Sequence, residues 1–108
     1  MKNVKDVEEL EEIIASDKDD VVVVKISAVW CGPCKVLSGT IAELEKEKLP
    51  GVVFVEVNAD ECDDICDKYN VRNLPTLIFL RGGVVMERVA GLVTKADLLA
   101  KIDSVRHA

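Results

Sequence analysis

Residues 21–34 read Val-Val-Val-Val-Lys-Ile-Ser-Ala-Val-Trp-Cys-Gly-Pro-Cys. The run Val21–Ser27 is rich in β-branched residues and lacks polar alternation, which predicts a strand covered on both faces. Pro33 suits the first turn of a helix, because it lacks only an N–H group that would be unpaired there. The stretch therefore predicts a buried strand that leads directly into a helix, with two cysteines at the junction.

The two cysteines are separated by two residues, so they can close a small disulfide ring and reopen it. The macrodipole and the free N–H groups of a helix N-terminus favour a thiolate there. Gly32 allows a tight turn and leaves the first sulfur open to solvent. We therefore predict that Cys31 is the exposed nucleophile and that Cys34, one turn into the helix, is the buried resolving thiol.

Length and composition predict one small globular domain covering residues 1–108, since 49% of the residues are hydrophobic. A formal net charge of −6 argues against nucleic acid or an anionic membrane as the main partner. No apolar run is long enough to span a bilayer, and the first residues do not resemble a signal peptide. We expect a cytoplasmic protein, in which a pair of closely spaced cysteines points to redox or metal chemistry.

Helical and strand patterns alternate on both sides of the central stretch. Asp6 with Glu9, and Thr94 with Asp97, match the spacing of helix N-terminal caps. Gly82-Gly83 is typical of a two-residue hairpin between strands. The expected strands are 1–4, 21–27, 52–57, 76–80 and 84–89. The expected helices are 7–16, 33–48, 60–69 and a final one after Thr94, and Asp60 is the expected cap of the helix at 60–69. Residues 17–20 are expected to form a charged turn.

This order predicts an α/β protein with a central mixed sheet of four to five strands flanked by four helices. The motifs also support a resemblance to a known family. They are Trp30-Cys31-Gly32-Pro33-Cys34-Lys35, Leu74-Pro75-Thr76, Gly82-Gly83 and Gly91. Over essentially its whole length the chain resembles the thioredoxin family. The resemblance implies the thioredoxin fold and a protein-disulfide reductase activity.

The resemblance also implies roles for residues outside the cysteine motif. Pro75 matches the family's cis-proline, and the backbone of Leu74 would pair with an extended substrate segment. Five residues would form a low, apolar docking surface around the sulfurs: Trp30, Gly32, Pro33, Gly91 and Leu92.

The expected partners follow from the same resemblance. A flavin- or ferredoxin-dependent thioredoxin reductase would return the electrons, because the chain has no GxGxxG motif or other cofactor site. Implied clients are peroxiredoxins, methionine sulfoxide reductases and ribonucleotide reductase, and we expect a monomer. Two other functions remain open: a disulfide oxidase or isomerase, and a non-catalytic subunit that uses the fold for docking. Gly-Pro between the cysteines argues against the first, and the intact pair argues against the second.

One charge interrupts each of two apolar strands, Lys25 in the first and Glu56 in the second. Burying either charge alone would be costly, so we expect the two to meet inside the fold. The family commonly has an acid at the first position and often a lysine at the second, so the charges are exchanged here. Our hypothesis is that Glu56, or the coupled pair, moves the proton of the resolving thiol. The alternative is an ion pair with no catalytic part.

Cys62 and Cys66 are the remaining cysteines, four residues apart on an expected helix. Their Cβ atoms should then lie about 5–6 Å apart, too far for a disulfide without distortion. One interpretation places Cys66 in the core and leaves Cys62 as a partly exposed free thiol. Regulatory oxidation or intermolecular pairing through Cys62 is a second interpretation, which makes Cys62 and Cys66 candidate regulatory residues. A zinc site formed by all four cysteines is a third, which the Gly-Pro insert argues against.

Overall fold

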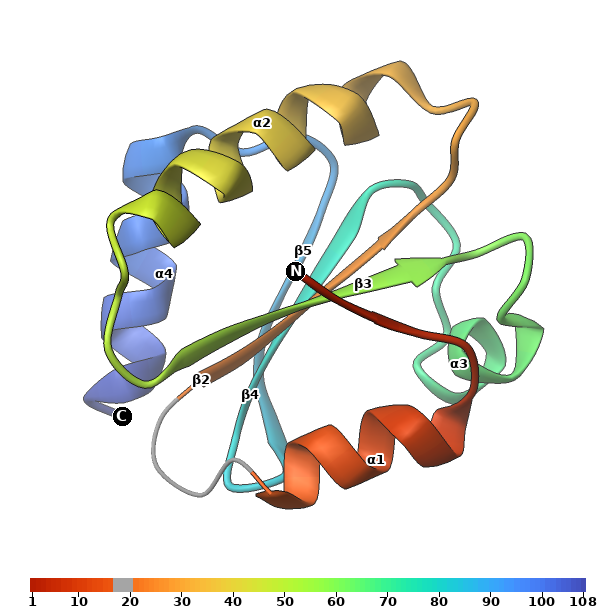
Figure 1. Ribbon diagram of the computed structural model, residues 1–108, viewed down its shortest axis with the longest axis horizontal. Helices are drawn as coiled ribbons and strands as arrows, with labels where there is room; N and C mark the ends of the chain where they lie inside the picture. Colours follow the sequence, from red (N-terminus) through yellow and green to blue (C-terminus); the bar gives the residue numbers. More distant parts are fainter. Residues whose placement is uncertain (17–20) are drawn as a thin grey trace.

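The computed structural model describes residues 1–16 and 21–108, so the charged turn expected at 17–20 lies outside the described residues (Figure 1). Five strands form one sheet. They are β1 (Lys2–Val4), β2 (Val21–Ser27), β3 (Val52–Asn58), β4 (Thr76–Arg81) and β5 (Val84–Ala90). The helices are α1 (Val7–Ser16), α2 (Gly32–Lys46), α3 (Asp63–Lys68) and α4 (Lys95–Arg106).

The strand order across the sheet is β1-β3-β2-β4-β5. β1 and β2 both pair in parallel with β3, whereas β4 pairs antiparallel with β2 and β5. Parallel neighbours need crossover connections, and the α-helices between the strands supply them. The expected α/β fold with a mixed sheet is confirmed.

β2 is the central strand, and every one of its residues is buried. Its alternate side chains enter two separate cores. Val22 and Val24 pack in the cluster that contains Leu10 of α1 and Ile65 of α3. Val21 and Val23 pack in the cluster that contains Leu37 of α2 and, from α4, Ile102. Figure 1 shows α2 and α4 on one side of the sheet and α1 and α3 on the other.

The helix caps and the hairpin expected from the sequence are confirmed by side-chain hydrogen bonds and backbone angles. Asp6 Oδ1 accepts the N–H of Glu9 at 2.9 Å, and Thr94 Oγ1 accepts the N–H of Asp97 at 3.1 Å. Gly82 and Gly83 connect β4 to β5 with φ of 58° and 81°. These positive values suit glycine and give the turn that tight hairpins prefer.

Two helices differ from the expected bounds. α2 ends at Lys46 rather than at residue 48, because Lys48 adopts a left-handed φ of 52°. α3 begins at Asp63, so the expected cap at Asp60 is wrong. The side chain of Asn58 accepts the N–H of Asp60 at 3.0 Å and holds the chain in a turn before the helix.

We predict a difference between the two faces of α2. Ile41 is fully buried in the core, whereas Val36 on the same helix is 58% exposed. Ile41→Ala should lower the free energy of unfolding by about 2–5 kcal/mol, because it removes buried methyl groups and leaves a cavity. Val36→Ala should change it by less than about 1 kcal/mol. Urea unfolding of both variants measures this, and equal losses would contradict the assigned core.

Candidate active site

The two cysteines lie where the carboxyl end of β2 passes into α2. Cys31 is the N-cap residue of α2, and its Sγ accepts the backbone N–H of Cys34 at 3.2 Å. The pair forms a disulfide with its Cα atoms 5.3 Å apart. The sequence places a Pro at the start of the helix, as expected, and the cap is a sulfur atom rather than a hydroxyl. A negative charge on this sulfur would be stabilised by the helix N-terminus.

The expected exposure of Cys31 is wrong for this disulfide form. Only 5% of Cys31 is exposed, against 2% of Cys34, so burial alone barely distinguishes the two. Cys31 and Cys34 pack with Ala28 in a small apolar cluster. Leu74, from the segment before β4, packs against this cluster. Gly32 and Pro33 between them are exposed, as expected.

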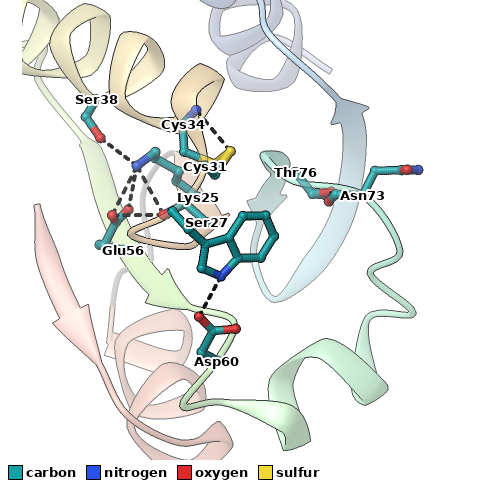
Figure 2. Close-up of a disulfide and its surroundings, with 10 residues drawn as sticks. Lys25, Ser27, Cys31, Cys34, Ser38, Glu56, Asp60, Asn73 and Thr76 are labelled. Atoms are coloured by element: carbon teal, nitrogen blue, oxygen red, sulfur yellow. Dashed lines mark hydrogen bonds and ion pairs between the residues drawn. A yellow bond between two sulfur atoms is a disulfide. The ribbon is translucent and has the colours of Figure 1, made fainter.

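The segment before β4 brings a second part of the chain to the disulfide. The Leu74–Pro75 peptide bond is cis, which confirms the expectation for Pro75. Pro75 O accepts the N–H of Gly91 at 2.8 Å, and Thr76 Oγ1 donates to Asn73 O at 2.6 Å. These bonds anchor the backbone on both sides of Leu74 close to the cysteine pair. Figure 2 shows this segment across from the active-site helix.

Exposed apolar side chains adjoin the motif. Trp30 is 69% exposed, and Leu92 is also exposed, so these two expected docking side chains are accessible to solvent. Gly91, between β5 and α4, is half-buried with a φ of 95°. Val29, which was not among the expected docking residues, is an exposed apolar neighbour of Trp30.

Asp60 contacts Trp30, which its place in the sequence did not indicate. Its Oδ2 accepts the indole N–H of Trp30 at 2.9 Å, as Figure 2 shows. This bond holds the edge of an exposed aromatic ring beside the disulfide, while the ring face stays accessible. Acidic residues near the start of a helix usually indicate capping, so the sequence favoured a cap rather than a contact with residue 30.

Lys25 and Glu56 are directly opposite each other on β2 and β3. The expected ion pair is present: Lys25 Nζ lies 3.0 Å from Glu56 Oε1 and 3.1 Å from Oε2. The Lys25 side chain is buried, and about a quarter of the Glu56 side chain is exposed. Two serines complete the cluster: Ser27 Oγ and Ser38 Oγ accept from Lys25 Nζ at 3.2 and 2.6 Å, and Ser27 Oγ also donates to Glu56 Oε1 at 3.0 Å.

A cavity of about 540 Å³ joins this polar cluster to the disulfide. Its walls include Lys25, Ser38 and Glu56 together with Cys34. Its walls carry apolar surface as well as these polar groups, and a space of this size can hold water in contact with both the cluster and Cys34. Only a tertiary arrangement of β2, β3 and α2 could show that these residues share one space.

Cys62 and Cys66 are free thiols in the structure. Their burial is the reverse of the expected order, since Cys62 is buried and Cys66 is half-buried. The late start of α3 causes the difference: Cys62 precedes the helix, and its Sγ donates to the carbonyls of Val4 and Lys5. Burial raises the pKa of both thiols; Asp64 raises the pKa of Cys62 further, and Asp63 raises that of Cys66.

Within residues 1–16 and 21–108, no group of three or more His, Cys, Asp or Glu side chains is placed to hold a metal ion. The zinc alternative therefore has no site among them. No helix in this part of the chain is long and apolar enough to cross a membrane.

The thioredoxin family model matches residues 2–104. The chain belongs to the thioredoxin family. It is 39% identical to an H-type thioredoxin of rice (Oryza sativa subsp. indica) over 86% of this chain and 73% of the relative. It is 38% identical to thioredoxin-T of Drosophila melanogaster over 92% of this chain and 62% of the relative. The structure of Fasciola hepatica thioredoxin superposes with a TM-score of 0.90 at 30% identity, covering 97% of this chain and 99% of that one.

This thioredoxin is therefore a dithiol–disulfide oxidoreductase that uses the Cys31–Cys34 pair. Such an activity needs a nucleophilic sulfur at a helix N-terminus and a second sulfur within bonding distance, and the junction of β2 and α2 provides both. A thioredoxin reductase is the usual source of electrons in the family.

We predict slow alkylation of Cys66 in the reduced protein. Its pKa is raised above the ordinary value of 9.0, mainly by burial and then by Asp63, so little thiolate exists near neutral pH. Iodoacetamide should label Cys31 at least about tenfold faster than Cys66 at neutral pH. Labelling of Cys66 should keep rising above pH 9.0 and should be faster in Asp63→Asn. Peptide mass spectrometry over time measures the rates, and equal labelling of the two cysteines would contradict the prediction.

Proposed function

We propose that this thioredoxin is a general dithiol donor to oxidised proteins, with Cys31 as the nucleophile and Cys34 as the resolving thiol. The observation that supports this assignment is the N-cap position of Cys31, whose sulfur accepts a backbone N–H of α2. Cys34 lies inside the first turn of α2, is 2% exposed and borders the cavity. Residues 1–108 act as one domain in this proposal.

The reaction consists of two exchanges. The Cys31 thiolate attacks one sulfur of a substrate disulfide, and the other substrate sulfur leaves with the bonding electron pair as a thiolate. The Cys34 thiolate then attacks Cys31 Sγ, and the second substrate sulfur leaves in the same way. The substrate gains two electrons and, after protonation, two thiols. The pair Cys31–Cys34 loses two electrons and becomes the disulfide seen in the structure.

Substrate docking uses the surface around the disulfide. An extended segment pairs with the backbone of Leu74, which the cis peptide bond and the bond from Gly91 hold next to the cysteines. Trp30, Gly32, Pro33, Gly91 and Leu92 form the rest of the contact surface. The bond to Asp60 keeps Trp30 in one orientation, which lowers the entropy lost when a substrate binds.

The proposed partners are a thioredoxin reductase, peroxiredoxins, methionine sulfoxide reductases and ribonucleotide reductase. A structural relative supports the peroxiredoxin assignment: a solved chain with a TM-score of 0.84 and 25% identity comes from work on how thiols are resolved in yeast mitochondrial 1-Cys peroxiredoxin via glutathione/thioredoxin systems. We further propose a monomer in the cytoplasm that serves electron transport and redox homeostasis.

Glu56 is the proposed proton acceptor for Cys34, acting with Lys25. The carboxylate is partly exposed and borders the same cavity as Cys34, so a proton can leave the thiol and later reach solvent. Lys25 Nζ contacts this carboxylate at 3.0 Å. In the family's common pattern the first of these two strands carries the acid and the second carries the lysine. Here β2 carries the lysine and β3 carries the acid, so both groups still lie under α2 but on exchanged strands.

We predict opposite outcomes for the two cysteine variants. Cys31→Ser should abolish catalysed reduction of insulin disulfides, in an assay where dithiothreitol supplies the electrons, because the nucleophile is lost. Cys34→Ser should attack substrates but accumulate mixed disulfides, visible as an added mass that thiols remove. Cys62→Ser is the matched control and should retain insulin reduction. If the wild-type protein does not reduce insulin, the oxidase or isomerase and the docking alternatives are favoured instead.

We predict that Glu56→Gln slows the resolving step about tenfold or more near neutral pH, because the amide cannot accept the proton. The rate should recover at alkaline pH, where Cys34 ionises without help. Lys25→Met should also change the pH profile, since it removes the charge that holds the carboxylate. Circular dichroism must show both variants folded, because breaking a buried pair costs about 3–5 kcal/mol. Wild-type profiles in both would leave a purely structural ion pair.

A further inference from the structure

Ser38 occupies a distinctive place on α2. It follows Cys34 by four residues, so the two side chains lie on the same face of the helix about one turn apart. Ser38 Oγ lies 2.6 Å from Lys25 Nζ, the shortest contact that the ammonium group makes. Figure 2 shows the lysine nitrogen between Ser38 on the helix and Glu56 on the sheet.

The hydrogen bonds of Lys25 determine which way the Ser38 hydroxyl points. An ammonium group has three N–H donors and no acceptor, and here its partners are Ser27, Ser38 and Glu56. Ser38 Oγ must therefore accept from Lys25. Its own hydrogen is left to donate elsewhere, and it meets no hydrogen-bond acceptor among residues 1–16 and 21–108.

Cys34 lies one turn before Ser38 on this face of α2 and offers an acceptor for this hydrogen once it is charged. Ser38 and Cys34 border the same cavity, and Cys34 becomes negatively charged only after the disulfide opens. We propose that Ser38 is a further catalytic residue of the resolving step: its hydroxyl, held by Lys25, donates a hydrogen bond to the Cys34 thiolate.

This role rests on the proposed function of Cys34 as the resolving thiol. After Cys31 has formed the mixed disulfide, Cys34 loses its proton to Glu56 and carries the negative charge until it attacks Cys31 Sγ. A donor that contacts the charged sulfur but not the neutral disulfide stabilises the thiolate selectively. The Lys25 ammonium group polarises the hydroxyl and makes it a stronger donor.

The charged groups that line the cavity come from five different elements or loops. Glu56 comes from β3 and Lys25 from β2, while the exposed Lys5, Lys35 and Glu61 line its walls. Ser38→Ala leaves all of these charges in place. A change in pH dependence in this variant therefore reports the lost hydroxyl rather than an altered charge.

The test uses the full chain, reduced and in excess over a chromogenic aryl disulfide. Attack by Cys31 releases one coloured thiolate, and attack by Cys34 releases a second, so stopped-flow absorbance separates the two steps. In Ser38→Ala the second step should be severalfold slower at neutral pH, because less Cys34 is ionised. Its rate–pH midpoint should move up by about one unit, with an alkaline plateau no lower than that of wild type, because a thiolate of higher pKa is a better nucleophile. The first step should be unchanged.

Two variants make the test specific. Ser38→Thr keeps a hydroxyl at the same position and should restore most of the lost rate. Thr40→Val removes a hydroxyl from the same helix, one that donates to Val36 O at 3.4 Å, and should behave as wild type.

Several results would overturn the proposal. An unshifted midpoint in Ser38→Ala, or a uniform slowing at every pH, would show that the serine only supports the local packing. If instead Cys34→Ser still releases the second thiolate, the assigned resolving thiol is wrong, which is a failure of the proposed function itself. If Glu56→Gln is slow and Ser38→Ala is normal, the proposed role of Ser38 is rejected while the proposed role of Glu56 stands.

Discussion

β2 is buried on both faces along its whole length, and the rest of the molecule depends on this burial. Its alternate residues form the floor of two cores, one under α2 and α4 and one under α1 and α3. A strand in this position cannot shift by one residue without moving every side chain to the wrong face. The carboxyl end of β2 is therefore fixed, and with it the place where Cys31 begins α2.

The same burial explains the polar cluster. Lys25 is the only charged residue of β2, and an unpaired ammonium at that depth would be strongly unfavourable. The parallel register places Glu56 directly opposite, and the two serines satisfy the remaining donors. Such a pair is weak evidence for stability, because apolar residues often replace buried ion pairs without loss. Its position under α2, beside the cavity that Cys34 also lines, is the position that the proposed proton transfer requires.

Local patterns predicted local structure well. The caps at Asp6 and Thr94 and the Gly82-Gly83 hairpin each depend on residues within a few positions of one another. The prediction failed where a distant partner competed. Asp60 suited a helix cap by its spacing, but it bonds to Trp30, and Asn58 holds the intervening backbone in a turn. Cys62 then precedes α3 and turns its thiol toward the end of β1, which no helical spacing could have indicated.

The amino-acid sequence by itself determined the element order, the mixed sheet and the redox pair, because these follow from hydrophobic periodicity and from four consecutive positions of the chain. It also predicted that Lys25 and Glu56 would meet, since neither charge could be buried alone. Only the tertiary structure decided that Leu74 packs against the disulfide and that Ser38 reaches Lys25. It also brought Cys34 and Glu56 to one cavity. These contacts join α2 to β2, β3 and the segment before β4, and their geometry depends on how the layers pack rather than on any one stretch of sequence.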